Sequence, residues 1–120
     1  MIVRVHLLAF GRYGEYREVD IPEAEEGLAA PYEKPLPGDN GHTFLERVFY
    51  WGQNDHQPQD KPSVSVGDVV EKWGKYWLCV PVGWKELSES QWLNYLGMSL
   101  VDRQVFCWGF DVPNVLRINQ

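Results

Sequence analysis

Residues 44–87 read FLERVFYWGQNDHQPQDKPSVSVGDVVEKWGKYWLCVPVGWKEL, and this segment predicts the fold more clearly than any other part of the chain. It begins with apolar residues at helical spacing, continues through a polar loop that ends at Pro62, and then turns to valines and aromatic residues separated by glycines. Helical spacing favours a helix, whereas β-branched and aromatic runs bounded by glycine are typical of strands joined by turns. The stretch therefore predicts one helix packed on a meander of two or three strands.

The predicted helix begins after Thr43, whose hydroxyl can cap it, and Glu46 three residues later completes a capping box. Gly52 is placed to end the helix as the residue after its C-cap. The apolar face of this helix is expected to consist of Phe44, Leu45, Val48 and Phe49. We expect this face to pack against one apolar face of the strands, made of Val64, Val66, Val69, Leu78 and Val80.

Strands are predicted at 63–66, 69–73 and 76–82. A turn at Gly67-Asp68 joins the first two, and Gly74-Lys75 forms a two-residue hairpin loop of the type II′ kind. At the first turn the Asp68 carboxylate can accept backbone N–H groups. We therefore interpret Asp68 as a structural residue rather than a catalytic one.

The N-terminal part extends the sheet. Residues 2–10 alternate between two faces, with one face made of Val3, Val5, Leu7 and Ala9. A second strand is expected to follow, with Arg17, Val19 and Ile21 on one of its faces. The two strands predict a hairpin over 2–21. Residues 22–42 are rich in proline and glycine and read as a long loop with one helical turn at 23–28.

A second helix is predicted over 89–96. Ser88 is its N-cap, Gln91 closes a capping box, and Leu87 with Trp92 fits a hydrophobic staple. Its buried face is expected to consist of Trp92, Leu93 and Leu96. Two closing strands are predicted at 104–108 and 115–118.

These elements predict a single α+β domain over 1–120, mainly an antiparallel sheet or half-barrel with two short helices. Its parts are an N-terminal hairpin at 2–21, a long loop at 22–42, a helix plus β-meander at 43–87, and a helix with closing strands at 88–120. A chain of 120 residues is long enough to bury a core without disulfides or metals.

The negative charge of the chain is concentrated in residues 15–33. The net charge is −6, and this segment holds seven acids against one base, so the rest of the chain is neutral. A field of this sign disfavours nucleic acid, because phosphate binding needs clustered lysines and arginines. The segment is either ordinary solvated surface or a patch for a basic partner, and its candidate binding residues are Glu23, Glu25 and Glu26.

The sequence carries no pattern typical of a catalytic or metal site. Cys79 and Cys107 lack the spacing of metal ligands or redox pairs, and we expect both to be reduced and buried. The three histidines share no HxH or HxxxH spacing. We therefore expect no enzymatic activity, no metal and no cofactor. The N-terminus lacks the features of a signal peptide and no apolar run reaches about 18 residues, so we expect a cytoplasmic protein without membrane contact.

The densest polar cluster, residues 53–57, follows the first helix. Asn54, Asp55 and His56 are candidate binding residues, with Trp51 and Trp84 as aromatic anchors beside the polar loop. In the alternative interpretation, the amide and carboxylate fix the loop by bonding backbone groups, and the two Trp rings close the ends of the core.

The central block also resembles a known family. The residues that carry the likeness are Val48-Phe49, Asn54, Pro58, Ser63-Val64-Ser65-Val66-Gly67-Asp68-Val69-Val70, Gly74, Tyr76 and Gly83-Trp84. They are similar to the YodL-like segment found in proteins of bacterial mobile elements and phages, over residues 45–87. The chain departs from that pattern at Gly67, where the family has Ser. The resemblance implies a setting, an accessory protein of a phage or mobile element, and the family has no established activity.

Three functions from different classes are considered, and the third is an enzyme with an unrecognised pocket. The first is a small acidic, non-enzymatic phage or mobile-element protein that binds and modulates a host or phage protein, inhibition of host defence being one such role. The second is a small RNA- or DNA-binding β-barrel, because the Gly67-Asp68 turn also resembles barrels of the PUA or ASCH type. The acidic balance of the chain favours the first.

Overall fold

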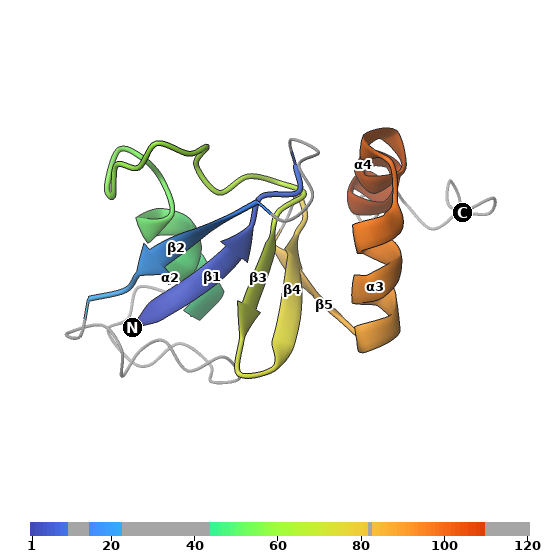
Figure 1. Ribbon diagram of the computed structural model, residues 1–120, viewed down its shortest axis with the longest axis horizontal. Helices are drawn as coiled ribbons and strands as arrows, with labels where there is room; N and C mark the ends of the chain where they lie inside the picture. The colour runs from blue at the N-terminus through green and yellow to red at the C-terminus, as the bar shows by residue number, and fades with distance from the viewer. Residues whose placement is uncertain (10–14, 23–43, 82, 110–120) are drawn as a thin grey trace.

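The computed structural model describes residues 1–9, 15–22, 44–81 and 83–109, and every structural statement below concerns these residues (Figure 1). They form β1 (Ile2–His6), β2 (Tyr16–Asp20), α2 (Phe44–Trp51), β3 (Val69–Lys72), β4 (Lys75–Cys79), β5 (Trp84–Leu87), α3 (Glu89–Gly97) and α4 (Leu100–Trp108). The strands make one open antiparallel sheet in the order β2-β1-β3-β4-β5. The predicted α+β class is confirmed.

The N-terminal hairpin was predicted correctly. β1 and β2 pair antiparallel, with Val5 opposite Arg17, and on its other side Val5 lies opposite Val70 of β3. The inward side chains of both strands are buried and the alternate ones, such as Ile2 and Arg4, are exposed. This alternation follows from the period of two along a strand.

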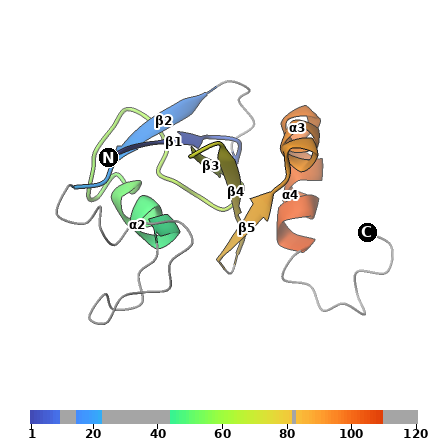
Figure 2. The same ribbon diagram turned by 90° about the horizontal axis from the view of Figure 1, so that it is seen from below.

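The two faces of the sheet are covered by different helices (Figure 2). α2 packs on the first face, in a core of Val3, Val5, Val19, Ile21, Phe44, Val48, Val64, Val70 and Trp77. α3 and α4 contribute to a second core, made of Leu8, Val69, Leu78, Val80, Leu87, Trp92, Tyr95 and Cys107. Val69 and Val70 are neighbours on one strand, so their side chains point to opposite faces of the sheet. The two cores to which they belong therefore lie on opposite faces.

This division corrects the predicted packing of the meander. Val69, Leu78 and Val80 do not pack against α2 but belong to the core beneath α3 and α4, and Val66 packs at its margin. Val70 and Trp77 take their place against α2. The alternation of side chains between the two faces of a strand was predictable from the sequence, but the face that each helix covers was not.

Two predicted helix faces are also corrected. Phe49 was expected in the core and is 36% exposed, because it lies about 100° around the helix from the buried Val48. Leu93 was expected on the buried face of α3 and is 59% exposed, whereas Tyr95 is fully buried there. The capping box at Ser88 and Gln91 is confirmed.

The segment 104–108 is helical, not a strand. α4 begins after Ser99, whose hydroxyl accepts a hydrogen bond from the Asp102 N–H. Its buried side chains, Arg103 and Cys107, are four residues apart, which is helical spacing. The described residues therefore contain three helices rather than two.

The meander has three strands, but they are not the three expected. Residues 63–66 lie outside the sheet, and the third strand is β5. The β3–β4 turn is Trp73-Gly74, because Lys72 pairs with Lys75. Both turn residues have positive φ, 52° and 73°, which is the type I′ pattern rather than type II′.

Gly52 does not end α2 by adopting a positive φ. It is buried, and a Cβ added to it would lie 2.7 Å from the Val48 carbonyl oxygen and collide with the Val64 side chain. Because Gly52 has no side chain, the chain that leaves α2 can pass close to residues 63–66. The expected cap at Thr43, the helical turn at 23–28, most of the loop at 22–42 and the strand at 115–118 lie outside the described residues.

Candidate functional site

The polar loop that follows α2, residues 53–62, lies along β2, and we call it the edge loop. The loop is held by the side chain of Arg17, which belongs to β2 and is buried. The Arg17 guanidinium donates to Asn54 Oδ1 at 3.0 Å, to the Pro62 carbonyl at 2.9 Å and to the Gln57 carbonyl at 2.9 Å. Burial lowers the pKa of Arg17, and the nearby Asp68 raises it. Asn54 therefore holds the edge loop in place.

The edge loop also closes the outer edge of β2. The Gln57 side-chain amide accepts from the Asp20 N–H at 2.8 Å and donates to the Asp20 carbonyl at 2.9 Å, as a neighbouring strand would. Gln59 Nε2 donates to the Glu18 carbonyl, and Lys61 Nζ donates to the Tyr16 carbonyl. These bonds occupy backbone groups that an added strand would need, so this edge is protected against pairing with another chain.

The other candidates from the sequence do not converge on one surface. Asp55 and His56 are exposed, and the His56 ring stacks on Tyr50 at 3.9 Å between centroids. Trp51 is partly buried against the first core. Trp84 is also partly buried against that core but begins β5, at the opposite edge of the sheet from the edge loop. Glu23, Glu25 and Glu26 lie outside the described residues.

Asp68 is built into the turn as its sequence predicted. Its Oδ1 accepts from the Ala9 N–H at 2.9 Å and its Oδ2 from the Ser65 N–H at 2.8 Å. Burial nevertheless raises its pKa to about 7, against the lowering effect of these hydrogen bonds and of Arg17. The carboxyl group has no exposed surface to offer a substrate.

Neither Cys79 nor Cys107 is in a disulfide bond, and both are buried, as expected. Burial, followed by the nearby Asp68, raises the pKa of the Cys79 thiol to about 12, so it is not a nucleophile at neutral pH. Among the described residues no group of three or more His, Cys, Asp or Glu side chains could hold a metal ion. No helix in the described ranges is long and apolar enough to span a bilayer.

The candidate site lies on the face of the sheet opposite α2. The strand register places four side chains side by side across four strands: Glu18, Arg4, Glu71 and Tyr76. We call these residues the cross-sheet row. Helices α3 and α4 pack over the β3–β5 part of this face, so the β1–β2 part stays open, with Ile2 50% exposed and Arg4 and Glu18 exposed.

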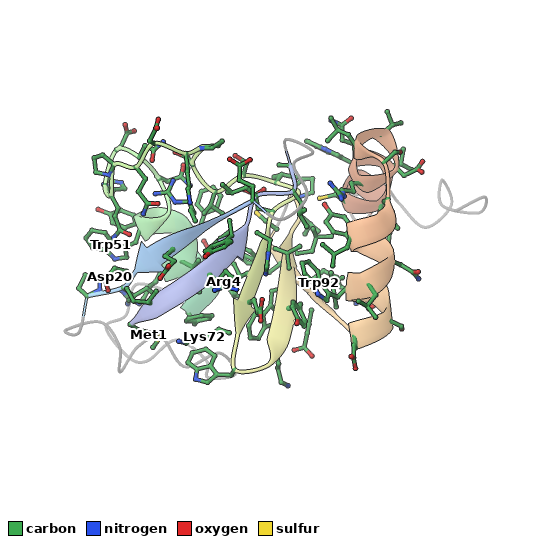
Figure 3. All side chains as sticks on the ribbon, viewed as in Figure 1. Met1, Arg4, Asp20, Trp51, Lys72 and Trp92 are labelled. Carbon is green, nitrogen blue, oxygen red and sulfur yellow. The ribbon has the colours of Figure 1, made fainter. Side chains whose placement is uncertain are left out.

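Side-chain contacts fix this row in place. His6 Nε2 lies 2.7 Å from Glu71 Oε1, and the His6 ring packs on Trp92 of α3 with 4.9 Å between centroids. Trp92 in turn stacks on Tyr76 at 4.6 Å, with 14° between the ring planes. At the open end, the Arg4 guanidinium lies 4.2 Å from the Tyr16 ring centroid, within cation–π range. Figure 3 shows Arg4 on the open sheet and Trp92 beside α3.

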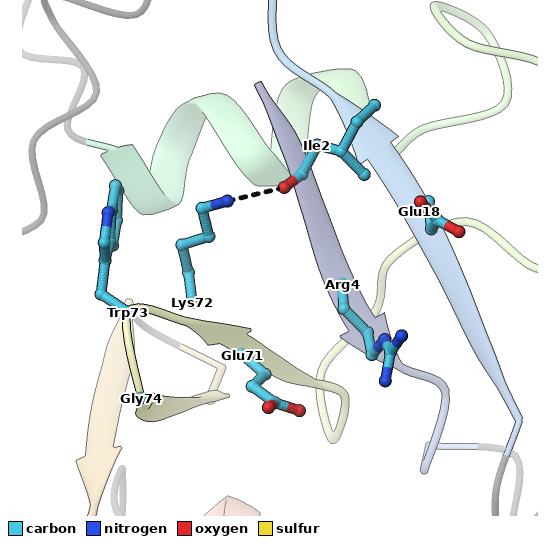
Figure 4. A pocket seen from close by; sticks show the side chains of 7 residues that line it. All are labelled: Ile2, Arg4, Glu18, Glu71, Lys72, Trp73 and Gly74. Carbon is cyan, nitrogen blue, oxygen red and sulfur yellow. Dashed lines mark hydrogen bonds between the residues drawn. The ribbon is translucent and has the colours of Figure 1, made fainter.

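Two cavities lie along the row. One, of about 230 Å³, is lined by Arg4, Glu18 and Glu71 and by the Lys72–Gly74 end of β3. Figure 4 shows Arg4 between the two carboxylates, and Lys72 Nζ bonded to the Ile2 carbonyl at 2.9 Å. The second, of about 410 Å³, lies where β5 runs into α3 and is lined by aromatic rings and acids. Gly74 borders both, so they adjoin at the β3–β4 turn.

One signal of this site was visible in the sequence, namely the alternation that places Arg4 and His6 on one face of the first strand. It did not reveal the partner strands. Glu71 contacts His6 only because β1 pairs with β3. Trp92 contacts the His6 and Tyr76 rings only because α3 folds back over the sheet.

Chemically, the described part of this surface offers charged and aromatic groups, which can bind a partner of complementary charge. Comparison of the chain with protein-family models, with curated proteins and with solved structures finds no match.

Proposed function

We propose that this protein is a non-enzymatic accessory protein of a phage or mobile element, which binds a partner protein through the cross-sheet row. The observation that carries the proposal is the uneven covering of the sheet. The first face lies under α2, whereas the second face is left open over β1 and β2 and presents charged and aromatic side chains there. Arginine and aromatic side chains, such as Arg4 and Tyr16 here, are enriched in protein contact surfaces.

The charges of the open region favour a protein partner over nucleic acid. The carboxylates of Glu18, Asp20 and Glu71 lie there with Arg4, with Lys72 and with the N-terminal ammonium, which is 3.4 Å from Asp20 Oδ1. The region therefore lacks the clustered basic groups that phosphate binding needs, whereas charges of both signs can complement a protein surface. A single-stranded nucleic acid would also need free aromatic faces to stack on, and Trp92 is only 7% exposed.

The proposed setting rests on the YodL-like pattern of residues 45–87. In the structure several residues of that pattern stabilise turns. Asp68 accepts hydrogen bonds from two backbone N–H groups, and Gly74 and Gly83 have positive φ. A pattern made of such residues describes a scaffold. Binding specificity then lies in side chains outside it, such as Arg4 and Trp92, and inhibition of a host defence protein is one function that such a scaffold could serve.

The proposal is tested by capturing partners from a bacterial lysate on the immobilised protein. We expect one or a few proteins to be retained by the wild type and by Asp55→Lys, which changes an exposed residue of the edge loop. Arg4→Thr, an exposed change in the cross-sheet row that adds no negative charge between Glu18 and Glu71, should lose them. Both variants should unfold in urea as the wild type does, since both sites are at the surface.

Three outcomes would contradict the proposal. Loss with Asp55→Lys alone would move the contact to the edge loop. Retention by both variants would remove the cross-sheet row from the contact. Saturable binding of a labelled single-stranded oligonucleotide, without a protein partner, would favour the nucleic-acid alternative.

A further inference from the structure

The cavity of about 410 Å³ at the junction of β5 and α3 has an aromatic wall. Tyr76 of β4 and Trp92 of α3 both line it, and they stack on each other. Trp92 is also held by His6, which is held by Glu71. The rings are therefore fixed before any ligand arrives, so binding to them does not require the rings to be ordered first.

A carboxylate also borders the cavity. Glu89, the first residue of α3, lines it, and Lys75 is another lining residue. Glu86 contributes to the lining as well, but it pairs with Trp77, whose side chain packs on the face of α2, so the Glu86 side chain points to that face. Within the described residues, no ion pair joins the Glu89 carboxylate to a basic side chain. Glu89 thus remains available to an incoming cation.

The carboxylates near Tyr76 also affect its phenol. The pKa of Tyr76 is raised first by burial, and then by the negative charges of Glu71 and Glu89. Burial disfavours any charged group, whereas the two carboxylates disfavour a phenolate and favour a cation. The cavity thus combines a partly buried aromatic ring with nearby carboxylates, which together are features of a site for a cationic group.

The geometry points to this cavity as the receptor for an arginine side chain of the partner protein, which rests on the proposed function and names the chemistry that it recognises. A guanidinium is planar, so it can lie against the partly buried Tyr76 ring and still direct its N–H groups at Glu89. Lysine presents a compact, strongly hydrated charge and lacks this combination. The volume of the cavity suits a side chain rather than a folded element.

The test uses small probes, so that it does not depend on the identity of the partner. N-acetyl-arginine methylamide is titrated into the full-length protein while the Trp92 indole N–H signal is followed by NMR. Its citrulline analogue has nearly the same shape without the charge, and the lysine analogue has the charge without the plane. We expect saturable millimolar binding of the arginine probe, at least about tenfold tighter than that of the citrulline probe.

Variants show whether the acid of the cavity is responsible. Glu89→Gln should weaken the arginine probe to the level of the citrulline probe. Two controls should leave binding unchanged: Glu86→Gln, whose side chain points to the other face of the sheet, and Asp102→Asn, which removes an acid from the first turn of α4. Equal binding of the arginine and citrulline probes, or of the arginine and lysine probes, would overturn the assignment.

The partner and the cavity are separable in this design. If a partner is captured but the arginine probe neither binds the protein nor displaces that partner, the arginine assignment fails while the proposed function stands. If the probe binds as expected and no partner is captured, the cavity remains a guanidinium site while the proposed function fails.

Discussion

At the scale of single residues, two buried charges organise the fold. Arg17 satisfies carbonyl groups of a loop that has no strand partner, and its Nε finds no acceptor among the described residues. Arg103 binds the Tyr95 and Leu96 carbonyls at the end of α3 and so joins α4 to it. Both arginines bond neutral oxygens, which means that geometry rather than ion pairing holds them. A sequence pattern shows neither role, because either residue could lie on a surface.

The first prediction concerns the pH dependence of stability. The pKa of Asp68 is raised to about 7 in the folded state, mainly by burial, and Arg17, Cys79 and Tyr95 are the charged or titratable groups around it. A raised pKa means that the folded state binds the proton more tightly than the unfolded chain. Its contribution is therefore fully present below about pH 4 and is lost as pH rises through about 7.

The measurement compares urea unfolding of the wild type and of Asp68→Asn across this range. The asparagine does not titrate and keeps one acceptor, so it adds an offset that does not change with pH. We expect the stability of the wild type relative to the variant to fall by up to about 4 kcal/mol between pH 4 and 8. A difference that stays constant with pH would show that Asp68 has the same pKa in both states.

At the scale of elements, the second prediction separates two phenylalanines on α2. Phe44 is fully buried and contacts Trp77, with 6.0 Å between ring centroids, whereas Phe49 is 36% exposed. Phe44→Ala should cost about 3–5 kcal/mol, the usual penalty for removing a core aromatic, and Phe49→Ala should cost less than about 1 kcal/mol. The free energies come from urea unfolding of both variants. Equal losses would mean that α2 is rotated about its axis relative to the structure.

What could be predicted from the sequence follows from how local each signal is. The hairpin of β1 and β2, the capping box of α3 and the Asp68 turn depend on neighbouring residues, and all three are confirmed. Residues 63–66 alternate like a strand but bond to the Asp68 side chain and to Gly52 and Gln53 instead. α4 has β-branched residues that favour a strand, yet its burial spacing is helical.

The candidate site was missed for the same physical reason. Each of its contacts joins residues far apart in sequence, such as His6 with Glu71 and His6 with Trp92. Such contacts depend on strand order and on which face a helix covers, and periodicity determines neither. The edge loop shows the opposite case. Its Asn54 was correctly weighed as a loop-fixing residue, but its partner, Arg17, was visible only in the fold.

At the scale of the whole molecule, the charge is unequally distributed. The chain carries −6, and the whole of that charge belongs to residues 15–33. Arg17, the one base of that segment, is buried. Glu18, a member of the cross-sheet row, and Asp20, next to that row, are both exposed. The described end of the segment therefore presents negative charge on the same face as the proposed contact.

The last prediction tests whether this segment steers a basic partner toward the protein. Glu23→Gln, Glu25→Gln and Glu26→Gln together remove three charges from it, and the control Asp55→Asn, Asp60→Asn and Asp102→Asn removes three from the neutral remainder. Steering acts over distances that salt screens, about 10 Å at 0.1 M. The first variant should therefore associate more slowly with the captured partner, and its rate should depend less on salt. The control should retain most of the wild-type salt dependence. Equal slowing in both variants would mean that net charge alone matters, and unchanged rates in the first would reduce the segment to solvated surface.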